Sequence, residues 1–179
     1  MEIFILDNMI FDKIAEDEHL QRKILELKGS QKIRLLITSV QEYQLKRMPD
    51  TKKTERELFI ELANQMCEWV PAPNLLAGIS RAGIDMVGDS ELIVTISEDE
   101  RSGKQRISRN KLAWIQDESI ALTAKVYMGF LVTEEKKLIS RVKENIREVQ
   151  VLNFQEFSEK LNNIYTYTHI LHQEKMMSI

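Results

Sequence analysis

The sequence predicts an α/β fold, a three-layer sandwich in which helices cover both faces of a mostly parallel central sheet. Short apolar runs typical of doubly buried strands alternate along the chain with amphipathic helical patterns. Only 6 Gly and 3 Pro occur in 179 residues, which leaves few of the tight turns that a β-sandwich needs. With 43% hydrophobic residues the chain can bury one core, so we expect a single domain over residues 1–179.

The first part of the chain contains two strand–helix units. Ile3–Leu6 and Leu35–Thr38 are continuous apolar runs rich in β-forming residues, and they predict buried strands. After each run the apolar residues recur at intervals of three or four, which predicts helices over residues 8–14, 19–27 and 39–45. Strand and helix therefore alternate, as they do around a parallel sheet.

The middle of the chain is less regular. Apolar spacing from Thr51 to Val70 predicts a long amphipathic helix that is broken by Pro71. After that helix, Leu92–Ile96 fits either a strand or a helix segment, because short apolar runs do not distinguish the two. We therefore interpret residues from about 70 to 108 as an insertion into the domain.

The alternation returns in the last third. Asp117 stands at the head of a helical pattern, and Gly129 stands where a C′ glycine would end that helix. Phe130–Thr133 predicts the next buried strand. The remaining elements that we expect are a helix over 134–143, a strand over 149–154, a helix over 155–164 and a short C-terminal extension after about residue 165.

Charge and cysteine content limit the function classes. With 25 Lys+Arg against 28 Asp+Glu the net charge is −3, which excludes the strongly basic balance of a non-specific nucleic-acid coat protein. The single Cys67 excludes an internal disulfide and a Cys-rich zinc site, as in a reducing compartment. The first residues are acidic and no apolar run approaches about 18 residues, so we expect a soluble cytoplasmic protein with no membrane association.

Acidic residues follow several of the predicted strands. In an open α/β sheet the functional crevice lies at the carboxyl ends of the strands. Asp7, Glu42, Asp117 and the pair Glu134 and Glu135 are placed to reach that edge. Carboxylates gathered there would raise one another's pKa unless a cation lay among them. Oxygen ligands without His or Cys favour Mg²⁺ or Mn²⁺, and such a centre can activate water and stabilise the charge of a phosphodiester.

Four segments in order resemble the motifs of the PIN-domain family, metal-dependent nucleases best known as the toxins of bacterial toxin–antitoxin pairs. Phe4–Asn8 resembles the first-strand motif and Thr38–Leu45 the second. Asp117–Ala124 is similar to the third, and Leu131–Glu135 is similar to the fourth without a gap in register. The resemblance covers roughly residues 2–48 and 110–160, and it leaves residues 70–108 unexplained.

The resemblance implies a PIN-type endoribonuclease that cleaves RNA with metal-activated water. It implies that Asp7, Glu42, Asp117 and Glu135 hold Mg²⁺ or Mn²⁺ and that Thr133 positions the site. It also implies an RNA substrate and, by family habit, a homodimer and an antitoxin-like protein partner. The family usually has Thr or Ser where Asn8 stands and Asp where Glu135 stands.

Two other functions are compatible with the pattern. The departures at Asn8 and Glu135 favour a catalytically degenerate PIN-like module that binds RNA or protein without cleaving. A phosphoryl-transfer or receiver-like domain would also place an acid such as Asp7 after the first strand. An aspartyl-nucleophile phosphatase would need a second Asp two residues later, where the chain has Met9.

One stretch is locally basic. Residues 101–111 contain no acidic residue and five cationic ones, which are Arg101, Lys104, Arg106, Arg109 and Lys111. A cluster of this kind suits contact with a phosphate backbone, so we predict a nucleic-acid-binding role for it.

Overall fold

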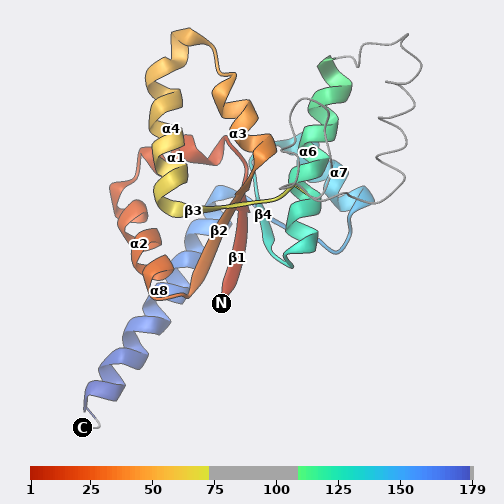
Figure 1. The fold of residues 1–179 in the computed structure, drawn as a ribbon. Helices are drawn as coiled ribbons and strands as arrows, with labels where there is room; N and C mark the ends of the chain where they lie inside the picture. Colours follow the sequence, from red (N-terminus) through yellow and green to blue (C-terminus); the bar gives the residue numbers. More distant parts are fainter. Residues whose placement is uncertain (73–108, 178–179) are drawn as a thin grey trace.

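The computed structural model describes residues 1–72 and 109–177 of the chain. Within them, five strands form one all-parallel sheet in the order β3-β2-β1-β4-β5 (Figure 1). The strands are β1 (Glu2–Leu6), β2 (Ile33–Thr38), β3 (Cys67–Val70), β4 (Phe130–Val132) and β5 (Gln150–Leu152). The predicted α/β class is confirmed. The insertion expected at about 70–108 lies outside the described residues from position 73 onward.

Helices cover both faces of the sheet. Phe4 and Leu6 of β1 belong to one buried core, whereas Ile5 between them belongs to a second core on the opposite face. The first core is covered by α1 (Ile10–Ala15), α2 (Glu18–Gly29), α4 (Lys53–Met66) and α8 (Phe154–Met177). The second is covered by α6 (Arg109–Val126) and α7 (Lys136–Asn145). Helix α3 (Ser39–Lys46) contributes to both cores, and a short 3₁₀ turn, η1 (Asp50–Lys52), joins it to α4.

The prediction of a continuous helix from Thr51 to Val70 is wrong at its end. Helix α4 stops at Met66, and the next four residues form the edge strand β3, which pairs in parallel with β2. Pairing with β2 buries Cys67 and Val70. The local apolar spacing suits a helix, but the hydrogen bonds and burial that β2 offers decide the conformation.

The expected start of α6 is also wrong. The helix begins at Arg109, so Asp117 lies about two turns inside it rather than at its head. Asp117 therefore does not cap the helix. Its carboxylate instead lies against Arg141 of the neighbouring α7.

Gly129 is needed for a reason other than the predicted one. The left-handed residue that closes α6 is Met128, with φ 50°, and Gly129 comes one position later. A Cβ on Gly129 would lie 2.7 Å from Ile5 Cδ1 and 2.9 Å from the carbonyl oxygen of Ile3. Glycine at this position thus allows the turn into β4 to pass directly against β1.

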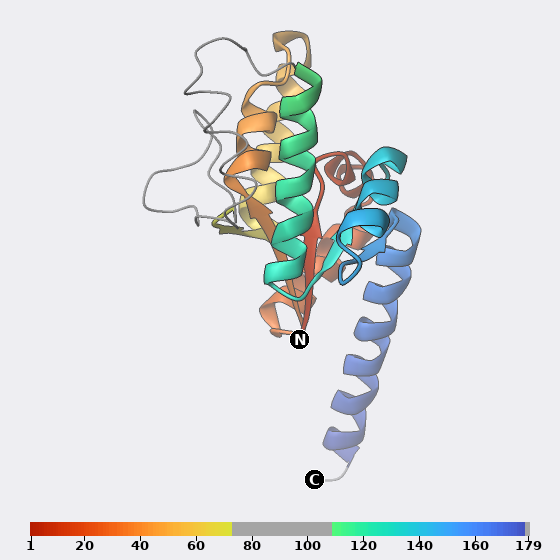
Figure 2. The same ribbon diagram turned by 90° about the vertical axis from the view of Figure 1, so that its right-hand side faces the viewer.

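The last helix is longer than expected. Helix α8 continues through the predicted C-terminal extension to Met177, and its C-terminal part projects beyond the rest of the molecule (Figures 1 and 2). Among the residues that the structure describes, no helix combines the length and the apolar character needed to cross a membrane.

The order of the strands reverses at the centre of the sheet. From β1 the chain adds β2 and then β3 on one side, whereas β4 and β5 lie on the other side of β1. At such a reversal the connections leave the sheet in opposite directions, and a crevice opens beyond the carboxyl ends of the two central strands. Leu6 and Val132 are the last paired residues of β1 and β4, so Asp7 and Thr133 enter this crevice together.

Candidate functional site

The centre of the site is the contact between Asp7 and Thr133. Thr133 Oγ1 donates a hydrogen bond of 2.6 Å to Asp7 Oδ2, and the backbone N–H of Glu135 donates to the same Oγ1 at 3.1 Å. The Asp7 backbone is tied to β4 as well, because its N–H donates to the carbonyl oxygen of Val132 at 2.9 Å. Thr133 is fully buried. Its hydroxyl therefore orients the Asp7 carboxylate and the backbone that carries Glu135.

Burial dominates the electrostatics of Asp7. Desolvation raises the pKa of its carboxyl group, and the hydrogen bond from Thr133 partly opposes this effect. The negative charge of Glu135 raises the pKa of Asp7 further. Asp7 and Glu135 are thus near enough to interact electrostatically.

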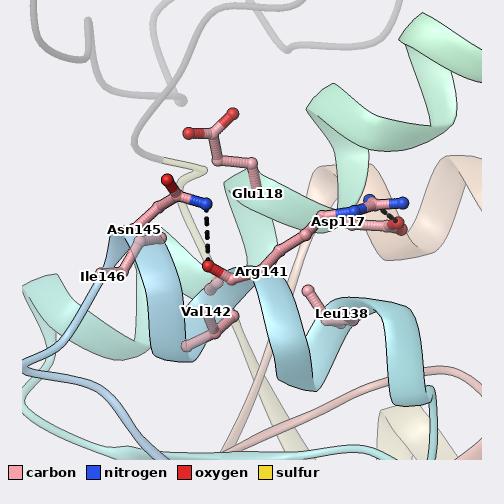
Figure 3. A pocket seen from close by; sticks show the side chains of 8 residues that line it. Asp117, Glu118, Leu138, Arg141, Val142, Asn145 and Ile146 are labelled. Atoms are coloured by element: carbon pink, nitrogen blue, oxygen red, sulfur yellow. Dashed lines mark hydrogen bonds and ion pairs between the residues drawn. The ribbon is translucent and has the colours of Figure 1, made fainter.

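Asp117 on α6 belongs to the same electrostatic group. Burial raises the pKa of Asp117 to about 6, and the charges of Glu135 and Asp7 add to the increase. Arg141 on α7 opposes them, since its Nη1 lies 3.2 Å from Asp117 Oδ2 (Figure 3). Three of the four carboxylates predicted as metal ligands, Asp7, Asp117 and Glu135, are therefore coupled electrostatically.

A cleft of about 330 Å³ lies beside Asp7 and Glu135. Its polar wall also includes Asp12, Asn8 and Gln44. The rest of its lining is apolar and consists of Met9, Leu45, Met48 and Phe59. The lining of the cleft thus combines acidic and amide side chains with apolar ones.

Helix α3 is fixed beside this cleft by amide side chains. Gln41 forms a reciprocal capping box with Thr38 and also donates from Nε2 to the carbonyl oxygen of Leu6 at the end of β1. Asn8 Nδ2 donates to the carbonyl oxygen of Gln41 at 3.2 Å and to Gln44 Oε1 at 2.8 Å. These contacts hold the first turns of α3 against the loop that follows Asp7, and they place Gln44 in the cleft.

Glu42 has a different environment from the other three predicted ligands. Its carboxylate pairs with Lys46 Nζ at 2.7 Å, one turn further along α3, and it does not line the cleft. Glu134 is also directed elsewhere, because its Oε1 accepts from the backbone N–H of Phe154 at 2.9 Å. On α3, Gln44 rather than Glu42 contributes to the cleft that Asp7 and Glu135 line.

The predicted basic segment is only partly described. Arg101, Lys104 and Arg106 lie outside the described residues. The backbone of Arg109 and Lys111 forms the first turn of α6.

The carboxylates of the site suit a hard cation by their chemistry. Asp7 and Glu135 in the cleft lining, and Asp117 outside it, offer oxygen donors, and the cleft lining contains no His or Cys, which favours Mg²⁺ or Mn²⁺. Among the side chains that the structure describes, those of residues 1–72 and 117–170, no group of three or more from His, Cys, Asp or Glu could hold a metal ion as it stands. Binding would therefore require these carboxylates to approach one another further.

Asp12, Gln44 and Arg141 are residues of the site that the sequence interpretation did not identify. The sequence could have indicated Gln44, because this residue lies one turn after Gln41 on the helix that follows β2. The sequence does not indicate Arg141, because its partner Asp117 lies on another helix. Comparison with known proteins adds no assignment: no family model and no curated protein matches the chain.

Proposed function

We propose that the chain is a divalent-metal-dependent phosphodiesterase, an endoribonuclease of the PIN type. The observation that carries the proposal is the position of Asp7, Asp117 and Glu135 around the strand-order reversal, with Thr133 joining the first and the last of them. Partly buried carboxylates that repel one another are costly unless positive charge is added. A cation that binds there offsets this cost.

Mg²⁺ or Mn²⁺ would be held by the carboxylates of Asp7, Asp117 and Glu135. When bound, it would supply Lewis-acid stabilisation of a phosphodiester and activation of water. Thr133 would hold Asp7 in a single orientation, so that less side-chain entropy is lost when the ligand set closes.

The lining of the cleft supports a single-stranded substrate. A base that is not paired could pack on Met48 and Phe59, while its phosphate lies toward Asp7 and Glu135 with the cation between them. Asn8 and Gln44 would offer amide groups to base edges or ribose. A helical duplex would not expose its bases to such a cleft.

Cleavage of a fluorescent single-stranded RNA by the purified full chain tests the proposal. We expect cleavage with Mn²⁺ or Mg²⁺, none with EDTA, and a loss of about 100-fold or more in Asp7→Asn and Asp117→Asn. Glu148→Gln is the matched control, because Glu148 is exposed and pairs with Lys125 away from the cleft. Equal cleavage by Asp7→Asn and wild type would rule the proposal out.

A second candidate is an RNA-binding module that does not cleave. It is favoured by the pairing of Asp117 with Arg141 and by the amide of Gln44 in the acidic wall. Under this alternative, RNA binds equally well with EDTA and with Mn²⁺, and Mn²⁺ does not raise the melting temperature. An antitoxin-like partner and a homodimer remain predictions from the resemblance. Size-exclusion chromatography with light scattering tests the dimer.

A further inference from the structure

The described lining of the cleft carries no positive charge. Its charged members are the carboxylates of Asp7, Asp12 and Glu135, and it contains no Lys, Arg or His. Carboxylates repel the phosphates of a nucleic-acid backbone, which proteins hold mainly with lysine and arginine. An RNA strand that enters the cleft therefore needs a cationic group immediately outside it.

The connection from α3 to α4 is a cationic segment beside the cleft. Residues 46–56 contain five Lys and Arg against two acidic residues, and Met48 in this segment lines the cleft. The segment stands beyond the carboxyl ends of the strands (Figures 1 and 2). Arg56 holds it there, because its Nη1 donates to the carbonyl oxygen of Met48 at 3.0 Å. The segment thus presents cationic side chains at a fixed place next to the cleft.

Arg47 differs from the other cationic residues of this segment in the group that it contacts. The other four form ion pairs, which are Lys46 with Glu42, Lys52 with Glu55, Lys53 with Glu57 and Arg56 with Asp50. Arg47 is exposed, and within the described residues it pairs with no carboxylate. Its Nη1 donates to the hydroxyl of Tyr43 at 2.6 Å, and its guanidinium carbon lies 5.2 Å from the centre of the Tyr43 ring. The charge of Arg47 is thus oriented but not neutralised.

Tyr43 and Arg47 lie next to the wall of the cleft. Gln44 and Met48, which line the cleft, directly follow Tyr43 and Arg47 in the chain. With 3.6 residues per turn, Tyr43 and Arg47 form a row on α3 beside the one that Gln44 begins. A guanidinium has five N–H donors, and the contact with Tyr43 uses one of them. Arg47 can therefore donate to a phosphate of a strand whose base lies in the cleft.

We propose that Arg47 binds a backbone phosphate of the single-stranded RNA next to the nucleotide in the cleft, and that Tyr43 is a positioning residue that orients the Arg47 guanidinium. The inference rests on the proposed function for its ligand, RNA, and adds a binding residue outside the acidic cleft. The contact requires no divalent cation, so it also forms in EDTA.

Fluorescence anisotropy of a labelled single-stranded RNA with the full chain in EDTA measures this contact without cleavage. Arg47→Gln should raise Kd by about fivefold. It should also reduce the slope of log K against log salt concentration by about 0.7, the amount expected for one phosphate contact on a single strand. Arg22→Gln is the matched control, because Arg22 is an exposed arginine on α2 that donates to the carbonyl oxygen of Glu18 and does not line the cleft. It should leave Kd and slope unchanged.

Tyr43→Phe tests the positioning role of Tyr43. The variant keeps the ring but loses the hydroxyl that accepts from Arg47. We expect Kd to rise by about twofold with an unchanged salt slope, because Arg47 still contacts the phosphate. In the double variant Tyr43→Phe with Arg47→Gln, the loss of affinity should equal that of Arg47→Gln alone. If Tyr43→Phe weakens binding by the same factor with Arg or Gln at position 47, Tyr43 does not act through Arg47 and this part of the inference is overturned.

The outcomes separate this inference from the proposed function. An unchanged Kd in Arg47→Gln, or an equal loss in Arg22→Gln, overturns the inference even if the wild type cleaves RNA with Mn²⁺. If the wild type binds RNA through Arg47 but does not cleave it with Mn²⁺, the proposed cleavage fails and the inference stands. If the wild type neither binds nor cleaves RNA, both fail.

Arg47→Lys covers the case in which Arg47→Gln does not fold. A lysine keeps the charge but lacks the planar guanidinium, which can donate two parallel hydrogen bonds to one phosphate. This variant should therefore keep the salt slope and raise Kd by about twofold. An unchanged Kd in Arg47→Lys would then overturn the inference.

Discussion

The side chains of Asp7 and Thr133 are in direct contact although 126 positions of the chain separate them, with 2.6 Å between Asp7 Oδ2 and Thr133 Oγ1. The contact exists because β1 and β4 are neighbours in the sheet and end at the same level. One buried hydroxyl thereby connects the end of the first strand with the backbone of Glu135. The predictions below begin with this hydroxyl.

Thr133→Val should destabilise the protein. Valine has nearly the same shape but cannot donate to Asp7 or accept from the N–H of Glu135, so each of these two groups loses one hydrogen bond. We expect a decrease in the free energy of unfolding of about 1–3 kcal/mol, measured by urea denaturation. Thr133→Ser keeps the hydroxyl and should lose less than half of this amount. A valine variant as stable as the wild type would show that the hydrogen bonds of Thr133 contribute nothing.

The raised pKa of Asp117 predicts a specific dependence of stability on pH. The folded-state pKa of about 6 lies above the ordinary value of 3.8, so the folded protein binds more protons than the unfolded chain between these values. The contribution of Asp117 to stability is therefore fully present below about pH 4, and it is lost as the pH rises through about 6.

Asp117→Asn removes this dependence, because an amide does not ionise. The difference in unfolding free energy between the variant and the wild type should shift in favour of the variant by on the order of 2 kcal/mol between pH 4 and pH 7. Urea denaturation of both proteins at the two pH values measures the shift. A difference that stays constant with pH would contradict the raised pKa.

Gln44→Glu should strengthen the binding of Mn²⁺. The substitution adds a carboxylate to the cleft wall beside Asp7 and Glu135, and a glutamate oxygen can still accept the hydrogen bond from Asn8. We expect Mn²⁺ affinity to increase by about tenfold in titration calorimetry, with a lower melting temperature in EDTA because like charges then repel. Gln150→Glu is the control, since Gln150 is exposed at the start of β5, at the opposite edge of the sheet. It should leave Mn²⁺ affinity unchanged.

Gly129→Ala should destabilise the fold although the change is small. The added methyl group would approach the backbone carbonyl of Ile3, which cannot move without disturbing β1. We expect a loss of about 1–3 kcal/mol in urea denaturation. Gly29→Ala is the comparison, because no atom lies within 4 Å of the added Cβ at the end of α2. It should be neutral or stabilising by up to about 1 kcal/mol. Equal effects of the two substitutions would contradict the close approach at Gly129.

The strands that could be predicted are those whose burial is visible in consecutive residues. β1, β2, β4 and β5 overlap apolar runs, and their alternation with helices indicates a parallel sheet. β3 could not be predicted in this way. Cys67–Val70 continues the apolar spacing of α4, and its conformation depends on hydrogen bonds to β2, which the local sequence does not encode.

The residues of the site also fall into two groups, those that the sequence locates and those whose position depends on packing. Asp7, Thr133 and Glu135 follow strands, so the rule that functional residues gather at the carboxyl ends of strands locates them from the sequence. The place of Asp117 in the middle of α6 and its contact with Arg141 depend on how two helices pack, and no local pattern reports this. The same is true of Glu42, whose side chain follows α3 toward Lys46.

The central position of β1 in the sheet has a consequence for folding during synthesis. Among the described strands β1 is synthesised before the others, and one of its two partners, β4, is synthesised only after Gly129. Until then the side of β1 that β4 will cover is an open strand edge, which can pair with other chains. The acidic site also cannot form earlier, because Thr133 and Glu135 follow β4. A nascent or truncated chain that ends before Phe130 thus carries the open edge without the site.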